Sequence, residues 1–172
     1  MNNTHPKRVF RFCPRCGSNA FEPFGTKAHA CADCKFELYT NASGAVVALI
    51  RNEKGEMLFT RRAFNPCKGM LDLPGGFIDP GETAEEALVR EVHEELNVQI
   101  EKAVYKGSSP NEYVFSGLSV FTVDLIFECT VLDFSTLQVA DDVISYEFHH
   151  VTPEILEQIG FSSIREIVVR NS

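Results

Sequence analysis

Three glutamates lie close together in the sequence, at positions 91, 94 and 95. Their spacing of i, i+3 and i+4 brings three carboxylates onto one patch of an α-helix. Carboxylates gathered in this way repel one another unless water or a cation separates them. Mg²⁺ binds through a few carboxylates while it shares the phosphates of a substrate. The cluster therefore indicates metal-assisted phosphate chemistry, and an ordinary acidic surface helix is the alternative.

The helix that positions these acids has recognisable ends. Thr83 and Glu86 have the spacing of a capping box, so we expect the helix to begin at Thr83. It should end near Leu96, because Asn97 is the usual substitute for Gly where the backbone turns left-handed. Apolar side chains recur at every fourth position and should face the core: Ala84, Leu88, Val92 and Leu96.

The segment from Gly76 to Val98 is similar to the Nudix box, G-x5-E-x7-R-E-U-x-E-E-x-G-U, where U is a bulky aliphatic residue. Asn97 replaces the family's last glycine and is compatible with the same backbone conformation. The other fixed positions match in one register: Gly76, Glu82, Arg90, Glu91, Val92, Glu94, Glu95 and Val98.

This resemblance implies a metal site and a reaction. The carboxylates of Glu91, Glu94 and Glu95, together with the backbone carbonyl of Gly75, would bind Mg²⁺ or Mn²⁺. The reaction would be hydrolysis of a nucleoside diphosphate linked to another group, with water attacking one phosphorus. Such ions neutralise phosphate charge and activate the attacking water.

The resemblance also implies roles for neighbouring charged residues. Glu82 and Arg90 would form a charge pair that orients the loop and the helix, although an ordinary surface salt bridge would contribute little. Family members differ in which carboxylate accepts the proton of the attacking water, so Glu91 and Glu95 both stay open. Three downstream acids are further candidates: Glu112, Asp141 and Asp142.

Substrate contacts are predicted on both sides of the box. Gly75 and Gly76 carry no side chain, so the backbone there can approach a ligand closely. Arg61 and Arg62 end a predicted strand just before the box loop. A contact with phosphate or base and a solvated strand end are interpretations of equal weight for these two arginines.

Residues 107–115, with the sequence GSSPNEYVF, are rich in turn formers and aromatic side chains. We expect them to form a loop that selects the substrate, because loops on a rigid scaffold carry specificity. Glu112 and Tyr113 are its candidate contact residues.

Four cysteines near the amino terminus predict a metal site of another kind. Cys13 and Cys16 form one C-x2-C pair, and Cys31 and Cys34 form a second pair after 14 intervening residues. Four thiolates at this spacing predict a closed, structural Zn²⁺ site, with two disulfides or unligated thiols as alternatives. Cys67 and Cys129 have no such spacing; Cys129 lies in an apolar segment and should be a core thiol.

The 172 residues, of which 44% are hydrophobic, suffice for one ordinary domain and a small module. We expect a zinc ribbon over residues 1–40 and a Nudix domain over residues 41–172. The family fold is α+β, an α/β/α sandwich with a mixed β-sheet. Strands are predicted at 45–50, 57–59, 98–105, 119–131 and 144–150, followed by helices capped by Thr152 and by Ser163 with Glu166.

Charge and hydropathy limit the partners. The net charge is −8 and the pI about 5.1, so a broad basic surface for nucleic acid is not suggested. NAD-capped RNA is a possible partner that the charge does not support. The amino terminus has no apolar run of signal-peptide length, and no segment has the roughly 18 apolar residues of a membrane span. We therefore expect a cytoplasmic protein.

A zinc ribbon ahead of a Nudix domain resembles the NADH pyrophosphatase arrangement, whose members split dinucleotides and in some cases remove NAD caps from RNA. That subgroup carries S-Q-P-W-P-F-P-x-S after the box, whereas residues 109–113 here read SPNEY. NADH or NAD and ADP-ribose or a nucleotide sugar therefore stay open as substrates. The non-enzymatic alternative is a catalytically silent Nudix-like nucleotide sensor with the ribbon as a docking module. A ribbon that mediates homodimerisation is compatible with catalysis.

Overall fold

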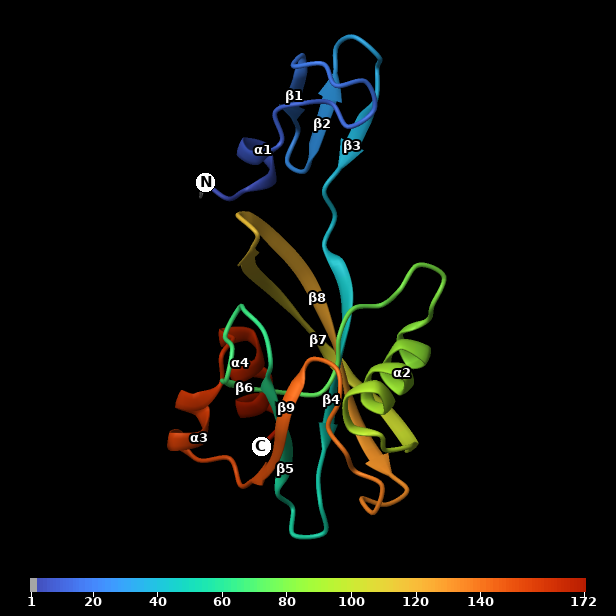
Figure 1. Ribbon diagram of the computed structural model, residues 1–172, viewed down its shortest axis with the longest axis vertical. Helices are drawn as coiled ribbons and strands as arrows, with labels where there is room; N and C mark the ends of the chain where they lie inside the picture. The colour runs from blue at the N-terminus through green and yellow to red at the C-terminus, as the bar shows by residue number, and fades with distance from the viewer. Residues whose placement is uncertain (1–2) are drawn as a thin grey trace. The chain divides into compact units, whose positions relative to one another are not determined.

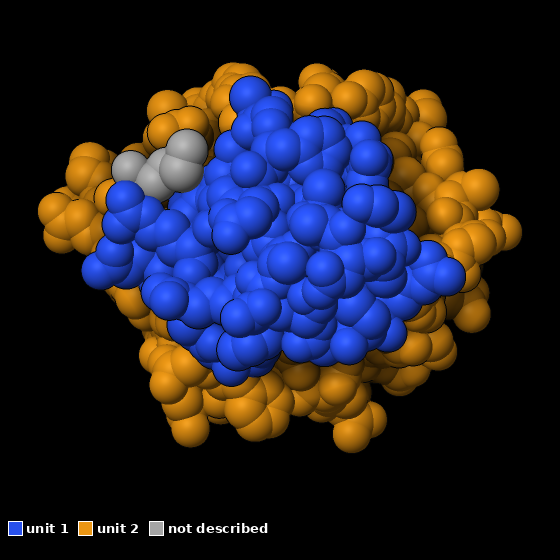
Figure 2. Space-filling model, turned by 90° about the horizontal axis from the view of Figure 1, so that it is seen from above, with its two compact units in different colours: residues 1–42, 112–121 blue, residues 43–111, 122–172 orange. Residues whose placement is uncertain are grey.

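The computed structural model describes residues 3–172, so residues 1 and 2 of the expected ribbon lie outside the described residues. The chain forms two compact units, which Figure 2 distinguishes by colour. The first comprises the chain up to Ala42 together with Glu112–Phe121. The second comprises Ser43–Asn111 and Thr122–Ser172.

Two three-stranded sheets organise the second unit, except that residues 112–121 at the end of one sheet belong to the first unit. In one, β8 (Leu118–Val131) lies between β4 (Ser43–Ile50), to which it runs parallel, and β7 (Ile100–Phe115). In the other, β5 (Met57–Arg62) pairs antiparallel with both β6 (Leu71–Asp72) and β9 (Val143–His149). The predicted mixture of parallel and antiparallel strands is confirmed.

Helices cover both faces of β4, as Figure 1 shows. Side chains alternate across a strand, so Val46, Ala48 and Ile50 share one apolar cluster with α2 (Ala84–Leu96). Val47 and Leu49 join a second cluster with side chains of α3 (Pro153–Gln158) and α4 (Ser162–Arg170). This is the α/β/α sandwich that the resemblance implied.

The ends of α2 are those that the sequence predicted. Thr83 Oγ1 accepts a hydrogen bond from the Glu86 N–H at 3.2 Å, and the Glu86 carboxylate accepts one from the Thr83 N–H at 2.8 Å. Asn97 ends the helix with a φ of 53°, in the left-handed region. Leu88, Val92 and Leu96 are buried, and burial of each such side chain is worth about 1.5–3 kcal/mol. This apolar face fixes the rotation of the helix and therefore the direction of its glutamates.

The predicted loop over residues 107–115 was wrong, because β7 continues through it to Phe115. The chain reverses at Ser116 and Gly117 instead, where φ is 49° and 78°. Pairing with β8 outweighs the local turn composition. Pro110 is tolerated because β7 is an edge strand, where the missing N–H costs no ladder hydrogen bond.

The predicted cap of the last helix was also wrong. Helix α4 begins at Ser162 with Phe161 at the N-cap position, and Ser163 lies inside the first turn with a buried hydroxyl. Ile164, Ile167 and Val168 bury the apolar face of α4 in the cluster that also contains Val47 and Leu49. Thr152 does precede α3, but its side chain makes no capping hydrogen bond.

The first unit contains a short helix and a small antiparallel sheet. Helix α1 (Pro6–Val9) precedes strands β1 (Phe21–Phe24), β2 (Ala28–Cys31) and β3 (Glu37–Tyr39), which pair in the order β1-β2-β3. No helix within residues 3–172 combines the length and the apolar content needed to cross a membrane.

Candidate active site

The loop ahead of α2 lies directly against β4. The carbonyls of Pro74 and Gly76 accept hydrogen bonds of 2.8 Å from backbone N–H groups of β4. Gly75 has a φ of 141°, and a Cβ atom there would lie 2.0 Å from the carbonyl oxygen of Val46. A Cβ atom on Gly76 would lie 2.5 Å from the carboxylate of Glu91. The two glycines therefore let one box carboxylate lie directly against the loop backbone.

Arg90 connects the loop to the acidic face of the helix. Its Nε and Nη2 donate to the two oxygens of Glu82, each at 2.9 Å, while Nη1 donates to Glu91 at 2.9 Å and to Glu94 at 3.1 Å. Nη2 also donates to the carbonyl of Phe77 at 3.0 Å. The hydrogen bonds from Arg90 lower the pKa of Glu82 from 4.5 to about 2. A bidentate ion pair of this kind fixes the relative orientation of the two side chains as well as pairing their charges.

Glu95 is the most enclosed carboxylate of the box. Its side chain belongs to the buried set, at 8% exposure, and Oε2 accepts a hydrogen bond from the Gly75 N–H at 3.2 Å. Burial raises the pKa of Glu95 well above its ordinary value, and the neighbouring carboxylates of Asp72, Glu91 and Asp142 act in the same direction. Burial likewise raises the pKa of Glu91, although Arg90 opposes it.

These carboxylates fit a hard divalent cation by chemistry. Oxygen ligands are those that Mg²⁺ prefers, and a bound cation would favour the charged forms of Glu91 and Glu95, which burial and the neighbouring carboxylates disfavour. They are not gathered around one point, however, because Arg90 holds Glu94 while Glu95 turns to the loop. The box supplies the donors, and Glu94 uses one carboxylate oxygen, Oε2, in its bond to Arg90.

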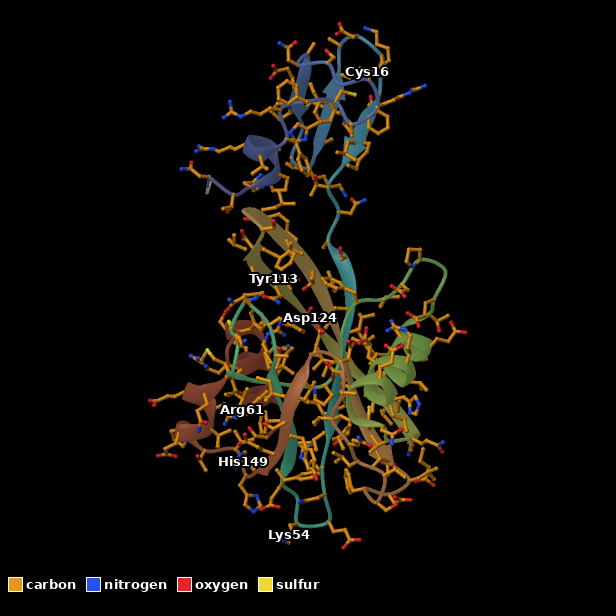
Figure 3. The ribbon with its side chains drawn as sticks, in the orientation of Figure 1. Cys16, Lys54, Arg61, Tyr113, Asp124 and His149 are labelled. Atoms are coloured by element: carbon orange, nitrogen blue, oxygen red, sulfur yellow. The ribbon has the colours of Figure 1, made fainter. Side chains whose placement is uncertain are left out.

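Two acids outside the box lie in the interior and were missed by the sequence reasoning. Asp72 on β6 receives hydrogen bonds from Arg62 at 2.7 Å and from the Leu73 N–H at 2.9 Å. Asp124 on β8, labelled in Figure 3, receives one from the Thr122 hydroxyl at 2.6 Å. Burial raises the pKa of both aspartates. A charged residue at an inward position of an apolar strand was the available signal.

The downstream acids divide into two groups. The Ala140 N–H donates to the Glu95 carbonyl at 3.0 Å, so the segment that carries Asp141 and Asp142 lies against the carboxyl end of α2. These aspartates contribute to the raised pKa values of Glu91 and Glu95, respectively. Glu112 instead belongs to the first compact unit, with Tyr113. The structure therefore brings Asp141 and Asp142 to the box, but does not bring Glu112 and Tyr113 into the unit that contains it.

Arg61 and Arg62 are bound within the second unit rather than solvated at a strand end. Arg61, labelled in Figure 3, pairs with Glu147 and donates to the carbonyl of Gly69 at 2.9 Å. Arg62 pairs with Asp72, and its guanidinium lies 5.0 Å from the ring centre of Phe161. Both side chains thus hold neighbouring strands and loops together.

The four amino-terminal cysteines lie together in the first unit. Sγ of Cys13 is 3.6 Å from that of Cys34, and Sγ of Cys16 is 3.7 Å from that of Cys31. All four sulfurs are within 4.8 Å of one another, and none forms a disulfide. A Zn²⁺ ion with bonds of roughly 2.3 Å places tetrahedral sulfur ligands about 3.8 Å apart. The set could hold Zn²⁺.

The family model of the NUDIX domain matches residues 42–162. The chain belongs to the Nudix family. The NAD-capped RNA hydrolase NudC of Vibrio parahaemolyticus is 30% identical over 120 residues, which cover 70% of this chain and 45% of that protein. The NAD-capped RNA hydrolase NudC of Pseudomonas syringae pv. syringae is 34% identical over 101 residues, or 59% of this chain and 36% of that protein. The chain spans less than half the length of these two relatives.

Solved structures agree on the Nudix fold. The crystal structure of a NUDIX hydrolase from Nitrosomonas europaea has a TM-score of 0.69 and 23% identity, covering 94% of this chain and 89% of that chain. The family and its sequence relatives support an enzyme of the pyrophosphohydrolase class, which the box predicted. Nudix enzymes use Mg²⁺ or Mn²⁺, so the acidic face of α2 is the candidate metal site.

Proposed function

We propose that this chain hydrolyses the diphosphate bond of a nucleoside diphosphate linked to a second group. The candidate substrates are an NADH- or NAD-like dinucleotide and ADP-ribose or another nucleotide sugar. The observation that carries the proposal is the complete set of box carboxylates, ordered by Arg90 and by the Gly75 N–H. Relatives named NAD-capped RNA hydrolase support the dinucleotide class.

In this proposal the residues of the box divide the work of the reaction. Mg²⁺ or Mn²⁺ held by Glu91, Glu94, Glu95 and the Gly75 carbonyl would neutralise phosphate charge and lower the pKa of a bound water. The pair of Glu82 and Arg90 keeps the loop and the helix in register, which fixes where the carboxylates point. Glu91 or Glu95 accepts the proton of the attacking water, and Asp141 or Asp142 can assist from the adjoining segment.

Residues outside the acidic face of α2 have different roles in the proposal. The absence of a side chain at Gly76 supports close backbone approach by a phosphate. The pairing of Arg61 with Glu147 and of Arg62 with Asp72 supports a positioning role for these arginines ahead of direct contact. Contacts through Glu112 and Tyr113, a cytoplasmic location and a homodimer stay predictions from the sequence.

We also propose that Cys13, Cys16, Cys31 and Cys34 bind one structural Zn²⁺ ion. Four sulfurs at near-tetrahedral separations, in a unit with few other buried side chains, support a metal that contributes folding energy. The set has no open position for a reacting water, which supports a structural role.

The test is a substrate panel. The purified chain is incubated with Mg²⁺ or Mn²⁺ and, separately, NADH, NAD, ADP-ribose, nucleotide sugars, dinucleoside polyphosphates and nucleoside triphosphates, and the products are separated and identified. We expect one diphosphate to be split into two monophosphate products. Absence of turnover with either metal, together with stabilisation by a nucleotide, would instead identify a nucleotide sensor.

A further inference from the structure

The amino-terminal part of the chain differs in charge from the rest. Residues 1–42 contain six Lys and Arg against three Asp and Glu, although the whole chain has a net charge of −8. This part of the chain therefore carries a local excess of positive charge, which favours an anionic ligand.

A pocket of about 790 Å³ lies in the first unit, between α1, the segment that follows it, and β1. Its volume is within the range of sites that hold small ligands. Three cations line it, Lys7, Arg8 and Arg11, and Glu22 is its one carboxylate. Three aromatic rings line it as well: Phe10, Phe12 and Phe21.

The cations keep hydrogen-bonding capacity for a ligand. Lys7 donates to the carbonyl of Gly25, and Arg8 donates to the side chain of Asn3 at 2.8 Å, so each is held at the pocket with further N–H groups to spare. The exposed guanidinium of Arg11 makes no hydrogen bond or ion pair within residues 3–172. Arg11 is thus the cation with most to gain from an anionic ligand.

The aromatic rings offer a fixed wall and an exposed face. Phe21 is buried and stacks on the ring of His29, with 5.0 Å between the ring centres. Phe10 contacts the same ring at 5.8 Å. Phe12 is 64% exposed, so its ring is accessible to a planar ligand. Stacking a nucleic-acid base on an aromatic ring strengthens binding, because it removes apolar faces of both groups from water.

We propose that this pocket is a binding site for single-stranded nucleic acid, with Arg11, Lys7 and Arg8 on the phosphates and Phe12 stacked on a base. Cations beside an accessible aromatic ring bind such strands with little sequence preference. Free phosphate would use the cations alone, and a base-paired duplex would hide the base faces from Phe12. The pocket residues belong to the first unit and the Nudix box to the second, and binding at the pocket does not depend on hydrolysis.

The test uses fluorescein-labelled 12-nucleotide single-stranded RNA and DNA that carry no diphosphate, with the zinc-loaded chain, and measures anisotropy between 50 and 200 mM salt. Contact with three phosphates predicts a slope of log K against log salt of about −2. Phe12→Ala should weaken binding about 5- to 150-fold. Arg11→Gln should weaken binding and reduce the slope by about 0.7. RNA and DNA should bind similarly, since nothing in the lining selects the sugar.

Lys27→Gln is the matched control, because Lys27 is an exposed lysine of the same unit outside the pocket lining. It should keep the wild-type affinity and salt slope. Glu95→Gln should also bind the strand as the wild type does, whatever the outcome of the substrate panel, because Glu95 is outside the pocket lining. Zinc content checks that each variant is folded. No binding at 50 mM salt, a preference for duplex, or equal losses in Lys27→Gln and Arg11→Gln would overturn the proposal.

Discussion

At the scale of single residues, the site depends on groups whose environment decides their behaviour. The same residue type has opposite pKa shifts within one motif: hydrogen bonds from Arg90 lower the pKa of Glu82, whereas burial raises that of Glu95. The sequence gives the identity and spacing of these acids. It does not give their burial, which depends on how the loop at Gly75 and Gly76 lies on β4.

The two box glycines should respond differently to alanine. Gly76→Ala would place a Cβ atom 2.5 Å from the Glu91 carboxylate, the movable end of a side chain. We expect a tenfold or greater loss of turnover with little change in melting temperature. Gly75→Ala would meet the backbone carbonyl of Val46 at 2.0 Å and should destabilise the fold by at least about 2 kcal/mol. Equal effects of the two changes on stability, measured by thermal unfolding, would contradict this account.

The pair of Glu82 and Arg90 predicts a pH dependence of stability. The folded-state pKa of Glu82 is about 2, below its ordinary value of 4.5, so its ionised form favours the folded state. That contribution is complete above about pH 5 and is lost as pH falls toward 2. Glu82→Gln should therefore lower the free energy of unfolding more at pH 6 than at pH 3, as measured by urea denaturation. A difference that is constant with pH would count against the pair, and Glu85→Gln, an exposed neighbour, is the control.

At the scale of elements, local chemistry predicts a helix better than it predicts a strand. Helix α2 has its cap, its stop residue and its apolar period in the sequence, and the structure agrees with all three. Strand β7 runs through residues with turn-forming composition, because its partner β8 lies outside any local window. The positions of Asp72 and Asp142 near α2 could not be predicted for the same reason. Strand pairing places Asp72 on β6, and a segment distant in the sequence returns to α2 with Asp142.

The contribution of the capping box of α2 can be measured by comparing two N-cap threonines, of which only one makes a side-chain capping bond. Thr83→Ala removes the hydrogen bond to the Glu86 N–H and should cost about 1 kcal/mol, or roughly 2–4 °C in melting temperature. Thr152 precedes α3 without a side-chain capping bond, so Thr152→Ala should change the melting temperature much less. A similar loss in both variants would show that the cap is not the source of the effect.

At the scale of the whole molecule, the chain consists of two compact units with different bases for stability. The second unit has two large apolar clusters, whereas the cluster of the first unit contains three buried side chains, two of them cysteines. A bound metal is one of the ways in which a unit with so small a core is stabilised. The C-x2-C spacing predicted that the four cysteines gather in this unit. The inclusion of residues 112–121 in the same unit could not be predicted from the local sequence.

Metal removal should therefore affect the two units unequally. We expect one Zn²⁺ per chain by elemental analysis, and loss of it in Cys31→Ser or with a strong chelator. Hydrogen exchange should then become faster in the first unit while α2 stays protected. Cys67→Ser, which removes a thiol outside the cluster, should keep the zinc. Uniformly faster exchange throughout the chain, or no zinc in the wild type, would contradict a separate structural site.

The central claim is that the acidic face of α2 performs metal-dependent hydrolysis of a diphosphate. The most direct measurement is the turnover number on the best substrate of the panel, across a Mg²⁺ titration, for the wild type, Glu95→Gln and Glu85→Gln. Glu85 is an exposed glutamate of the same helix, so the two variants make the same chemical change at different places. We predict a loss of about 10²–10⁴-fold for Glu95→Gln and less than twofold for Glu85→Gln. Equal activity in both variants would contradict the claim.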